Sequence, residues 1–162
     1  MTIKHKRIRE EIKQAKPFRT VSDEAFVTLQ RTSDVVLREF TRFLKSWAVS
    51  PTQYNVLRIL RGAGTEGLRC GEIAERMITH DPDITRLLDR MERAGWIERA
   101  RESKDRRVVV ARVSKSGLEL LKQIDRPIED HIQRTSGHMT EKRMRLLVDL
   151  LDELRAGFNQ QA

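Results

Sequence analysis

The chain has 162 residues, enough for one domain with a hydrophobic core and an added dimerisation part. It carries a formal net charge of +8, and 35% of its residues are charged. A balance this basic favours a polyanionic partner, either nucleic acid or an anionic membrane surface. The single cysteine, Cys70, excludes an intramolecular disulfide framework. Because the sequence shows neither a membrane-spanning apolar run nor a signal-peptide core, we expect a cytoplasmic protein without a membrane partner.

Residues 1–20 form a basic extension with seven Lys or Arg and two Glu. The spacing of its apolar residues fits a short basic helix that ends near Pro17. A solvated arm explains the same composition equally well. Both interpretations stay open at the level of the sequence.

A long helix is predicted over residues 22–47, because one set of mostly apolar side chains recurs every three or four residues. The set consists of Phe26, Leu29, Ser33, Val36, Phe40, Phe43 and Trp47. A stripe of this length needs a helical partner. A second helix is predicted to follow Ser50, with Pro51 at its first position and Gln53 completing a capping box.

Two shorter helices and a hairpin are predicted next. The face of the first helix consists of Cys70, Ile73, Ala74 and Met77. The second helix is predicted over residues 82–94, with Asp81 as its N-cap, Pro82 at its first position and Gly95 at its end. Residues 96–101 and 106–113 are rich in Val, Ile and Trp and predict a β-hairpin with a polar tip.

The C-terminal third predicts two more helices. The stripe of the first consists of Leu118, Leu121, Ile124, Ile128 and Ile132, and we expect Pro127 to bend or break this helix. The predicted dimerisation face of the last helix consists of Met144, Leu147, Val148, Leu151 and Leu154. Leu146 and Leu150 widen this face beyond what a lone surface helix needs, so we expect a homodimer.

The predicted helix at 82–94 has a charged face suited to DNA. Arg86 and Arg90 lie one turn apart, and arginine can donate two hydrogen bonds to guanine in the major groove. Asp83 either accepts a hydrogen bond from cytosine or interacts with the helix dipole, and the sequence leaves this open. The face alone is also compatible with an ordinary solvated surface, so the adjoining hairpin decides the interpretation.

That hairpin concentrates positive charge, with six Arg or Lys and two acids between residues 99 and 112. The narrow minor groove attracts inserted arginine. Asp105 lies two residues before Arg107 and can orient that guanidinium, which would reduce the rotamer entropy lost on insertion. We therefore predict wing support from Asp105. The predicted DNA contacts from this hairpin are Arg99, Lys104, Arg106 and Arg107.

The segment DITRLLDRMERAGWIERARESKDRRVVVARVSKSG, residues 83–117, resembles the recognition helix and wing of the multiple-antibiotic-resistance regulator (MarR) family. The matching pieces are Thr85-Arg86, the LDRME that follows, GWIER, and Asp-x-Arg at 105–107. The helix order extends the resemblance over about residues 22–160. It implies a winged-helix homodimer on a pseudo-palindromic operator, with DNA contacts from Thr85 and Arg86, Arg107 in the minor groove and Asp105 as its brace.

The resemblance also implies control by a small aromatic or phenolic effector, bound between the dimerisation helices and the winged domain. Phe40, Phe43 and Trp47 are candidates to line such a pocket, although aromatic residues in a helical stripe are more often core. The sequence identifies no effector-binding residue, no cofactor and no catalytic arrangement, so we expect no enzyme.

The expected fold is mainly α-helical with a small β-hairpin wing. Residues 1–20 are the basic extension, 50–113 a winged helix-turn-helix domain that binds double-stranded DNA, and 21–49 with 114–162 a helical dimerisation region. The expected function is a transcriptional repressor. The alternatives are a basic winged helix that binds RNA or protein without operator specificity, and a metal- or redox-responsive regulator. The alternative sensors would be His131 with His138, or Cys70.

Overall fold

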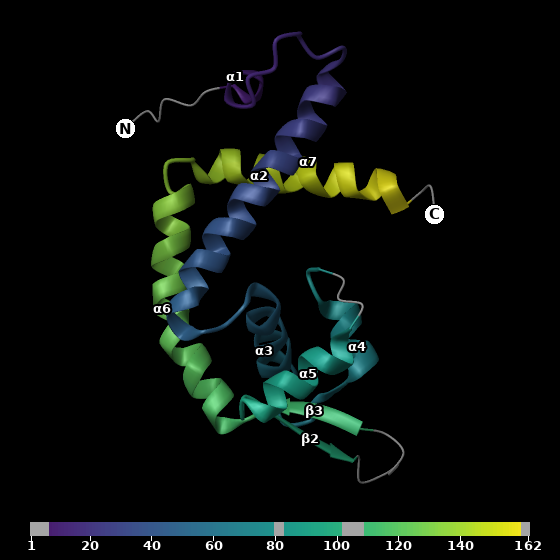
Figure 1. Ribbon diagram of the computed structural model, residues 1–162, viewed down its shortest axis with the longest axis vertical. Coiled ribbons are helices and arrows are strands. Elements are labelled where there is room, and N and C mark those ends of the chain that lie inside the picture. The colour runs from purple at the N-terminus through teal and green to yellow at the C-terminus, as the bar shows by residue number, and fades with distance from the viewer. Residues whose placement is uncertain (1–6, 80–82, 102–108, 160–162) are drawn as a thin grey trace. The chain divides into compact units, whose positions relative to one another are not determined.

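The computed structural model describes residues 7–79, 83–101 and 109–159, and it is mainly helical with one small sheet. Figure 1 labels the elements in chain order. They are α1 (Ile8–Glu11), α2 (Val21–Leu44), the 3-10 turn η1 (Lys45–Trp47), α3 (Pro51–Ala63), β1 (Leu68–Arg69), α4 (Cys70–Arg76), α5 (Ile84–Arg93), β2 (Ile97–Arg101), β3 (Val109–Val113), α6 (Lys115–Ser136) and α7 (Glu141–Asn159).

The chain divides into two compact units between Asp125 and Arg126. Residues 7–125 hold α1 to β3 and the first half of α6, and the second unit holds the rest of α6 with α7. α6 continues through Pro127, which lies two residues beyond the division. Of the two outcomes expected at this proline, a break is excluded. The missing N–H costs one hydrogen bond, and buried side chains on both sides of the proline, Ile124 and Ile128, keep the segment helical.

The predicted helix-turn-helix with a hairpin wing is confirmed. β2 and β3 pair antiparallel, from Ile97 opposite Val113 to Arg101 opposite Val109. The sheet has a third strand, β1, which pairs with β3 in the order β1-β3-β2. β1 was not predicted, because two residues are too few to show an alternating pattern. The fully buried core side chains of this unit include Leu57, Leu60, Ile73, Met91 and Ile97.

The helix predicted over residues 22–47 is confirmed as α2, although the α-helix ends at Leu44 and η1 follows it. The helix predicted after Ser50 is confirmed as α3. α2 begins after Thr20, whose hydroxyl accepts a hydrogen bond from the Asp23 N–H at 3.0 Å. The capping box of α3 is present, since the Gln53 N–H donates to Ser50 Oγ and the Ser50 N–H donates to Gln53 Oε1. Leu44 is the only buried residue of α2. Of the predicted stripe, Phe26, Ser33 and Val36 are exposed, and its other members are partly buried.

The basic extension is folded where the structure describes it. α1 is a single turn that ends at Glu11, well before Pro17, and Ile8 is buried. Two N–H groups of Arg9 donate to the carbonyl oxygens of Gln14 and Ala15. Arg31 of α2 donates to Glu11 Oε1 at 2.7 Å. Residues 7–20 are thus not a solvated arm, and their helix is shorter than the sequence suggested.

Across the described residues, no helix combines the length and the apolar character needed to cross a bilayer.

Gly117 allows α6 to start against the turn that follows α5. Its N–H donates to Ser114 Oγ at 3.0 Å, and a Cβ at this position would overlap the carbonyl oxygen of Trp96. We expect Gly117→Ala to lower the free energy of unfolding by about 2 kcal/mol, as in other overpacked sites. Chemical denaturation measures this change.

Gly62→Ala is the matched control, because a Cβ on this α3 residue would meet nothing within 4 Å. It should leave stability unchanged or raise it by up to about 1 kcal/mol. Equal losses for the two variants would contradict a specific contact at Gly117.

Candidate DNA-binding surface

α5 separates an apolar face from a charged face. Leu87, Leu88 and Met91 are buried. Thr85, Arg86 and Arg90 are exposed on the opposite side, and the Arg86 side chain is 78% exposed. The structure therefore places these three predicted DNA-contact residues together on one outward surface, within reach of a major groove. Their contact with DNA stays a prediction.

The start of α5 differs from the prediction. The helix begins at Ile84, and its N-cap is Asp83, whose Oδ1 accepts from the Arg86 N–H at 3.4 Å. The expected cap Asp81 and Pro82 lie outside the described residues. Asp81 and Asp83 are of the same residue type, one that N-caps prefer, and the structure has Asp83 in this position. Asp83 Oδ2 also pairs with Arg86 Nη1 at 3.1 Å, which orients that guanidinium.

Two substitutions separate the capping role of Asp83 from its charge. Asp83→Ala should lower the free energy of unfolding by about 1 kcal/mol, because the first turn of α5 loses its acceptor. Asp83→Ser keeps an acceptor and should retain most of that stability while removing the ion pair with Arg86. Urea denaturation of both variants measures the difference. Equal losses would show that the cap contributes nothing measurable.

The wing is described only along its strands. Lys104, Asp105, Arg106 and Arg107, the predicted tip contacts with their support, lie outside the described residues. Arg101, the last described residue before the tip, is exposed. Arg112 of β3 donates from Nε to the Thr65 carbonyl oxygen at 2.6 Å, so this arginine ties the wing to the loop before β1.

Arg99 of β2 turns toward α5. Its Nη2 lies 2.6 Å from both Asp89 Oδ1 and Glu92 Oε2, and its Nε donates to Glu92 Oε2 at 2.9 Å. The Arg99 side chain is 26% exposed. The sequence predicted a DNA contact here, but these donors already serve two carboxylates of the protein. The sequence signal for this arrangement was the pair of acids three residues apart on α5.

The hydrogen bond from Arg99 holds the pKa of Glu92 below its ordinary value, against the opposing effect of burial. The same pair raises the pKa of Arg99. A carboxylate with a depressed folded pKa adds stability above its unfolded pKa and loses it as the pH falls through the folded value. The interaction is therefore complete at neutral pH and weakens in acid.

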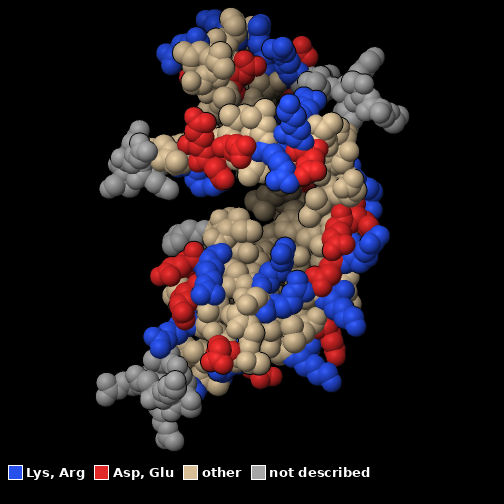
Figure 2. Space-filling model, turned by 180° about the vertical axis from the view of Figure 1, so that it is seen from behind, with Lys and Arg blue, Asp and Glu red and all other residues tan. Residues whose placement is uncertain are grey.

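The charged side chains on one face of the protein are of both signs. On the face shown in Figure 2, basic and acidic side chains are interspersed over the described residues. The candidate surface is identified instead by geometry, as an outward arginine face on α5 beside a hairpin.

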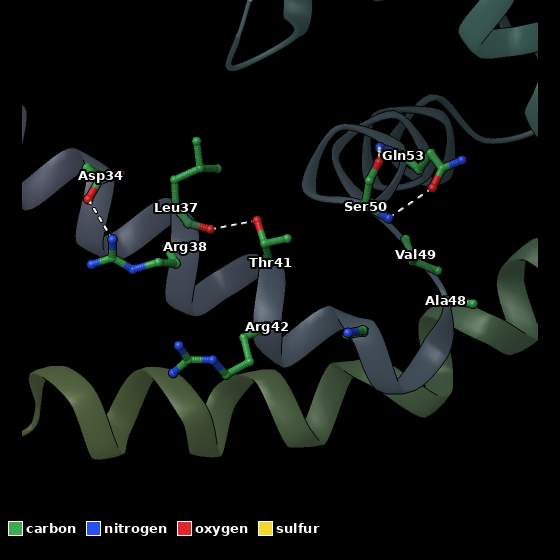
Figure 3. A pocket seen from close by; sticks show the side chains of 10 residues that line it. Asp34, Leu37, Arg38, Thr41, Arg42, Ala48, Val49, Ser50 and Gln53 are labelled. Atoms are coloured by element: carbon green, nitrogen blue, oxygen red, sulfur yellow. Dashed lines mark hydrogen bonds and ion pairs between the residues drawn. The ribbon is translucent and has the colours of Figure 1, made fainter.

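A second candidate site is a groove of about 850 Å³ between α2 and the start of α3. Its walls are Asp34, Leu37, Arg38, Thr41, Arg42, Lys45, Ala48, Val49, Ser50 and Gln53. Figure 3 shows the ion pair of Arg38 with Asp34, whose closest atoms are 3.0 Å apart, and the hydrogen bond from the Thr41 hydroxyl to the Leu37 carbonyl oxygen. Of the three cations at this groove, Arg38 pairs with Asp34 and Arg42 pairs with Glu39. Together with the apolar side chains of the groove, they suit a small organic anion.

The aromatic residues considered for an effector pocket do not line this groove. The rings of Phe40 and Tyr54 meet edge to face at 5.8 Å, and those of Phe43 and Trp47 lie 5.2 Å apart. Phe40 also stacks on Phe43. They pack against one another and join α2, η1 and α3, which is a packing role and not a ligand-lining one.

The other candidate sensors are Cys70 and the pair His131 with His138. Cys70 is a free thiol at the first residue of α4 and is partly exposed. Throughout the described segments, His, Cys, Asp and Glu side chains form no group of three that could hold a metal ion.

α4, the turn after it, α5 and the β2–β3 hairpin define a winged helix-turn-helix, the class of proteins that places a recognition helix in the major groove. The MarR family model matches residues 49–109. A MarR transcription factor from Planctomyces limnophilus is 34% identical, covers 84% of this chain and 98% of its own, and superposes with a TM-score of 0.64. The chain belongs to the MarR family and is a DNA-binding transcriptional regulator, not an enzyme.

Two further relatives show the range of this similarity. The homoprotocatechuate degradative operon repressor of Escherichia coli is 25% identical over 134 residues, which are 83% of this chain and 89% of the relative. The structure of NadR in complex with 4-hydroxyphenylacetate is 24% identical, covers 86% of this chain and 97% of its own, and has a TM-score of 0.66. The second likeness supports the fold.

Proposed function

We propose that the protein is a homodimeric repressor that binds a pseudo-palindromic operator in double-stranded DNA and leaves it when a small aromatic or phenolic effector binds. The proposal rests on the two faces of α5. This helix buries Leu87, Leu88 and Met91 and exposes Arg86 and Arg90 beside the wing. The similarity to an operon repressor of Escherichia coli supports this role.

Different residues have different tasks on the DNA. Arg86 and Arg90 contact guanine edges in the major groove, with Thr85 and Asp83 beside them. Arg107 enters the minor groove and Asp105 orients it. Lys104 and Arg106 neutralise phosphates and make binding steeply dependent on salt.

The proposed division of labour follows the domains expected from the sequence. Residues 50–113 bind DNA, residues 21–49 with 114–162 dimerise, and residues 1–20 are an extension. The compact unit that holds the winged helix continues to Asp125, and Leu121 and Ile124 of α6 are buried in it. The first half of α6, which we assign to the dimerisation region, is therefore also part of the compact unit that binds DNA.

The exposed apolar surface of α7 supports a second copy as the partner. Leu147, Val148 and Leu154 of the predicted face are exposed, and Met144 and Leu151 are partly exposed. Leu146, Leu150 and Phe158 add to this surface. Phe26 and Val36 of the α2 stripe are exposed as well. Apolar surface of this extent is characteristic of an interface, and an operator with two-fold symmetry needs a two-fold dimer.

The double variant Leu147→Glu/Leu151→Glu should convert the dimer to a monomer and abolish operator binding, because four charges would enter one apolar interface. Sedimentation equilibrium and operator titration measure the two effects. The control Lys142→Gln/Arg145→Gln makes the same change in net charge on the polar face of α7 and should leave both properties intact. A folded monomer of the unmodified protein at micromolar concentration would refute the proposed dimer.

The groove between α2 and α3 is the proposed effector site. Arg38, Arg42 and Lys45 surround an apolar floor that includes Leu37 and Val49, which suits the charge and the ring of a phenolic acid. The ligand in the NadR complex, 4-hydroxyphenylacetate, belongs to this chemical class. An anion here would act at the junction of α2 with the DNA-binding domain.

Selection of bound duplexes from a random pool tests the operator. We expect an enriched sequence with two half-sites related by two-fold symmetry, separated by about 10 base pairs centre to centre or a multiple of that spacing. A selection without any enriched sequence would favour the alternative, a basic winged helix that binds RNA or protein without operator specificity. The selected operator then serves as the specific duplex in affinity measurements.

A further inference from the structure

We propose that Arg99 is a positioning residue for operator recognition, which fixes the wing relative to α5 by holding Asp89 and Glu92 together. This role rests on the proposed function, because it concerns the two elements that contact DNA. It assigns to Arg99 an indirect effect on specificity in place of a contact with phosphate. We call Arg99, Asp89 and Glu92 the α5–β2 clamp.

The geometry of the clamp fixes both the side chain and the backbone of β2. Glu92 accepts from the Arg99 backbone N–H at 3.2 Å and from two nitrogens of its guanidinium. Nη2 also contacts Asp89 Oδ1 at 2.6 Å. A planar guanidinium can serve two carboxylates at fixed angles, whereas the single nitrogen of a lysine cannot reproduce this arrangement.

The clamp provides a second attachment between α5 and the hairpin. The first attachment is the turn itself, where the Trp96 N–H donates to the Met91 carbonyl oxygen at 3.0 Å. Ile97 of β2 is buried in the core, and the clamp adds a restraint on the same strand two residues nearer the tip. Arg99 pairs with Ala111 across the sheet, and the described strands end two pairs further along, at Arg101 and Val109. A rotation at Arg99 would therefore be carried to the wing tip.

The clamp also decides the charge that α5 presents. Asp89 and Glu92 are acids on a helix that approaches phosphates, and each is about 40% exposed or less. Arg99 is the cation that compensates them, so its charge is used within the protein. Arg86 lies in the first turn of α5, where a recognition helix contacts bases. Arg90 lies in the last turn, between the two clamp acids in the sequence, and its side chain is exposed.

Three roles for Arg99 make different predictions. A phosphate contact would contribute about 0.9 to the slope of log affinity against log salt, in each subunit, and would affect all DNA sequences alike. A merely stabilising ion pair would change unfolding without changing specificity. A positioning residue lowers the ratio of operator affinity to random-duplex affinity and leaves the salt slope unchanged.

The test uses the full-length variants Arg99→Gln and Arg99→Lys, with Arg101→Gln as the control. Arg101 is an exposed arginine two residues along the same strand and on the same face of it. Affinities for the selected operator and for a random duplex are measured over a series of salt concentrations. We expect Arg99→Gln to lower the affinity ratio about tenfold, comparable to one mismatched base pair, with an unchanged slope.

Arg99→Lys provides the sharpest comparison. It restores the positive charge, so random-duplex affinity should return to that of the unmodified protein while the affinity ratio stays low. Arg101→Gln should keep the ratio within twofold. A lower slope with an unchanged ratio for Arg99→Gln would establish a phosphate contact and overturn the proposal. An unchanged ratio and slope would reduce the clamp to an ordinary ion pair.

Glu92→Gln carries the test if Arg99→Gln fails to fold. This variant makes the protein more positive, so simple electrostatics predicts tighter binding to all DNA. The clamp predicts a lower ratio of operator to random-duplex affinity, and equal tightening on both duplexes would overturn it. If the unmodified protein selects an operator but every variant keeps its ratio of operator to random-duplex affinity, only the positioning role of Arg99 is overturned. A failure to select any operator overturns the proposed function and this role with it.

Discussion

The packing of α5 into the winged core, through Leu87, Leu88 and Met91, is the contact on which the rest of the structure depends. Helical periodicity then turns Arg86 and Arg90 to the opposite side, because residues on opposite faces of a helix cannot share one environment. The outward arginine face is thus a consequence of the buried face. The N-cap at Asp83 completes this arrangement by fixing where the helix begins.

A basic protein that contacts DNA still carries acids on its recognition helix. Asp83 caps α5 and orients Arg86, while Asp89 and Glu92 hold Arg99. In each case a carboxylate restrains an arginine whose flexible side chain would otherwise lose entropy on ordering. Net charge explains attraction to DNA in general, and these local pairs provide fixed directions, which sequence discrimination needs.

The helices outside the winged domain, α2 and α7, have apolar surface that a single chain does not cover. α2 and α7 are amphipathic, yet much of their apolar surface stays exposed in a single chain. Within residues 7–125, the aromatic contacts of Phe40 and Phe43 show how the C-terminal part of α2 is covered, whereas Phe26 nearer its start is half exposed. Covering this surface with a second copy would also bring two winged domains to one operator, so stability and symmetry favour the same assembly.

The sequence by itself determined the elements whose signals are local. Periodicity located α2 and α5, the residues Ser50, Pro51 and Gln53 located the start of α3, and β-branched residues located the wing strands. Only the tertiary structure decided features that depend on distant packing. It chose Asp83 as the cap, kept α6 intact through Pro127, added β1 to the sheet and folded the extension onto α2. It also paired Arg99 with Asp89 and Glu92. Sequence shows that an arginine is present on a strand, but the direction of its side chain is set by which charged groups another element brings within reach.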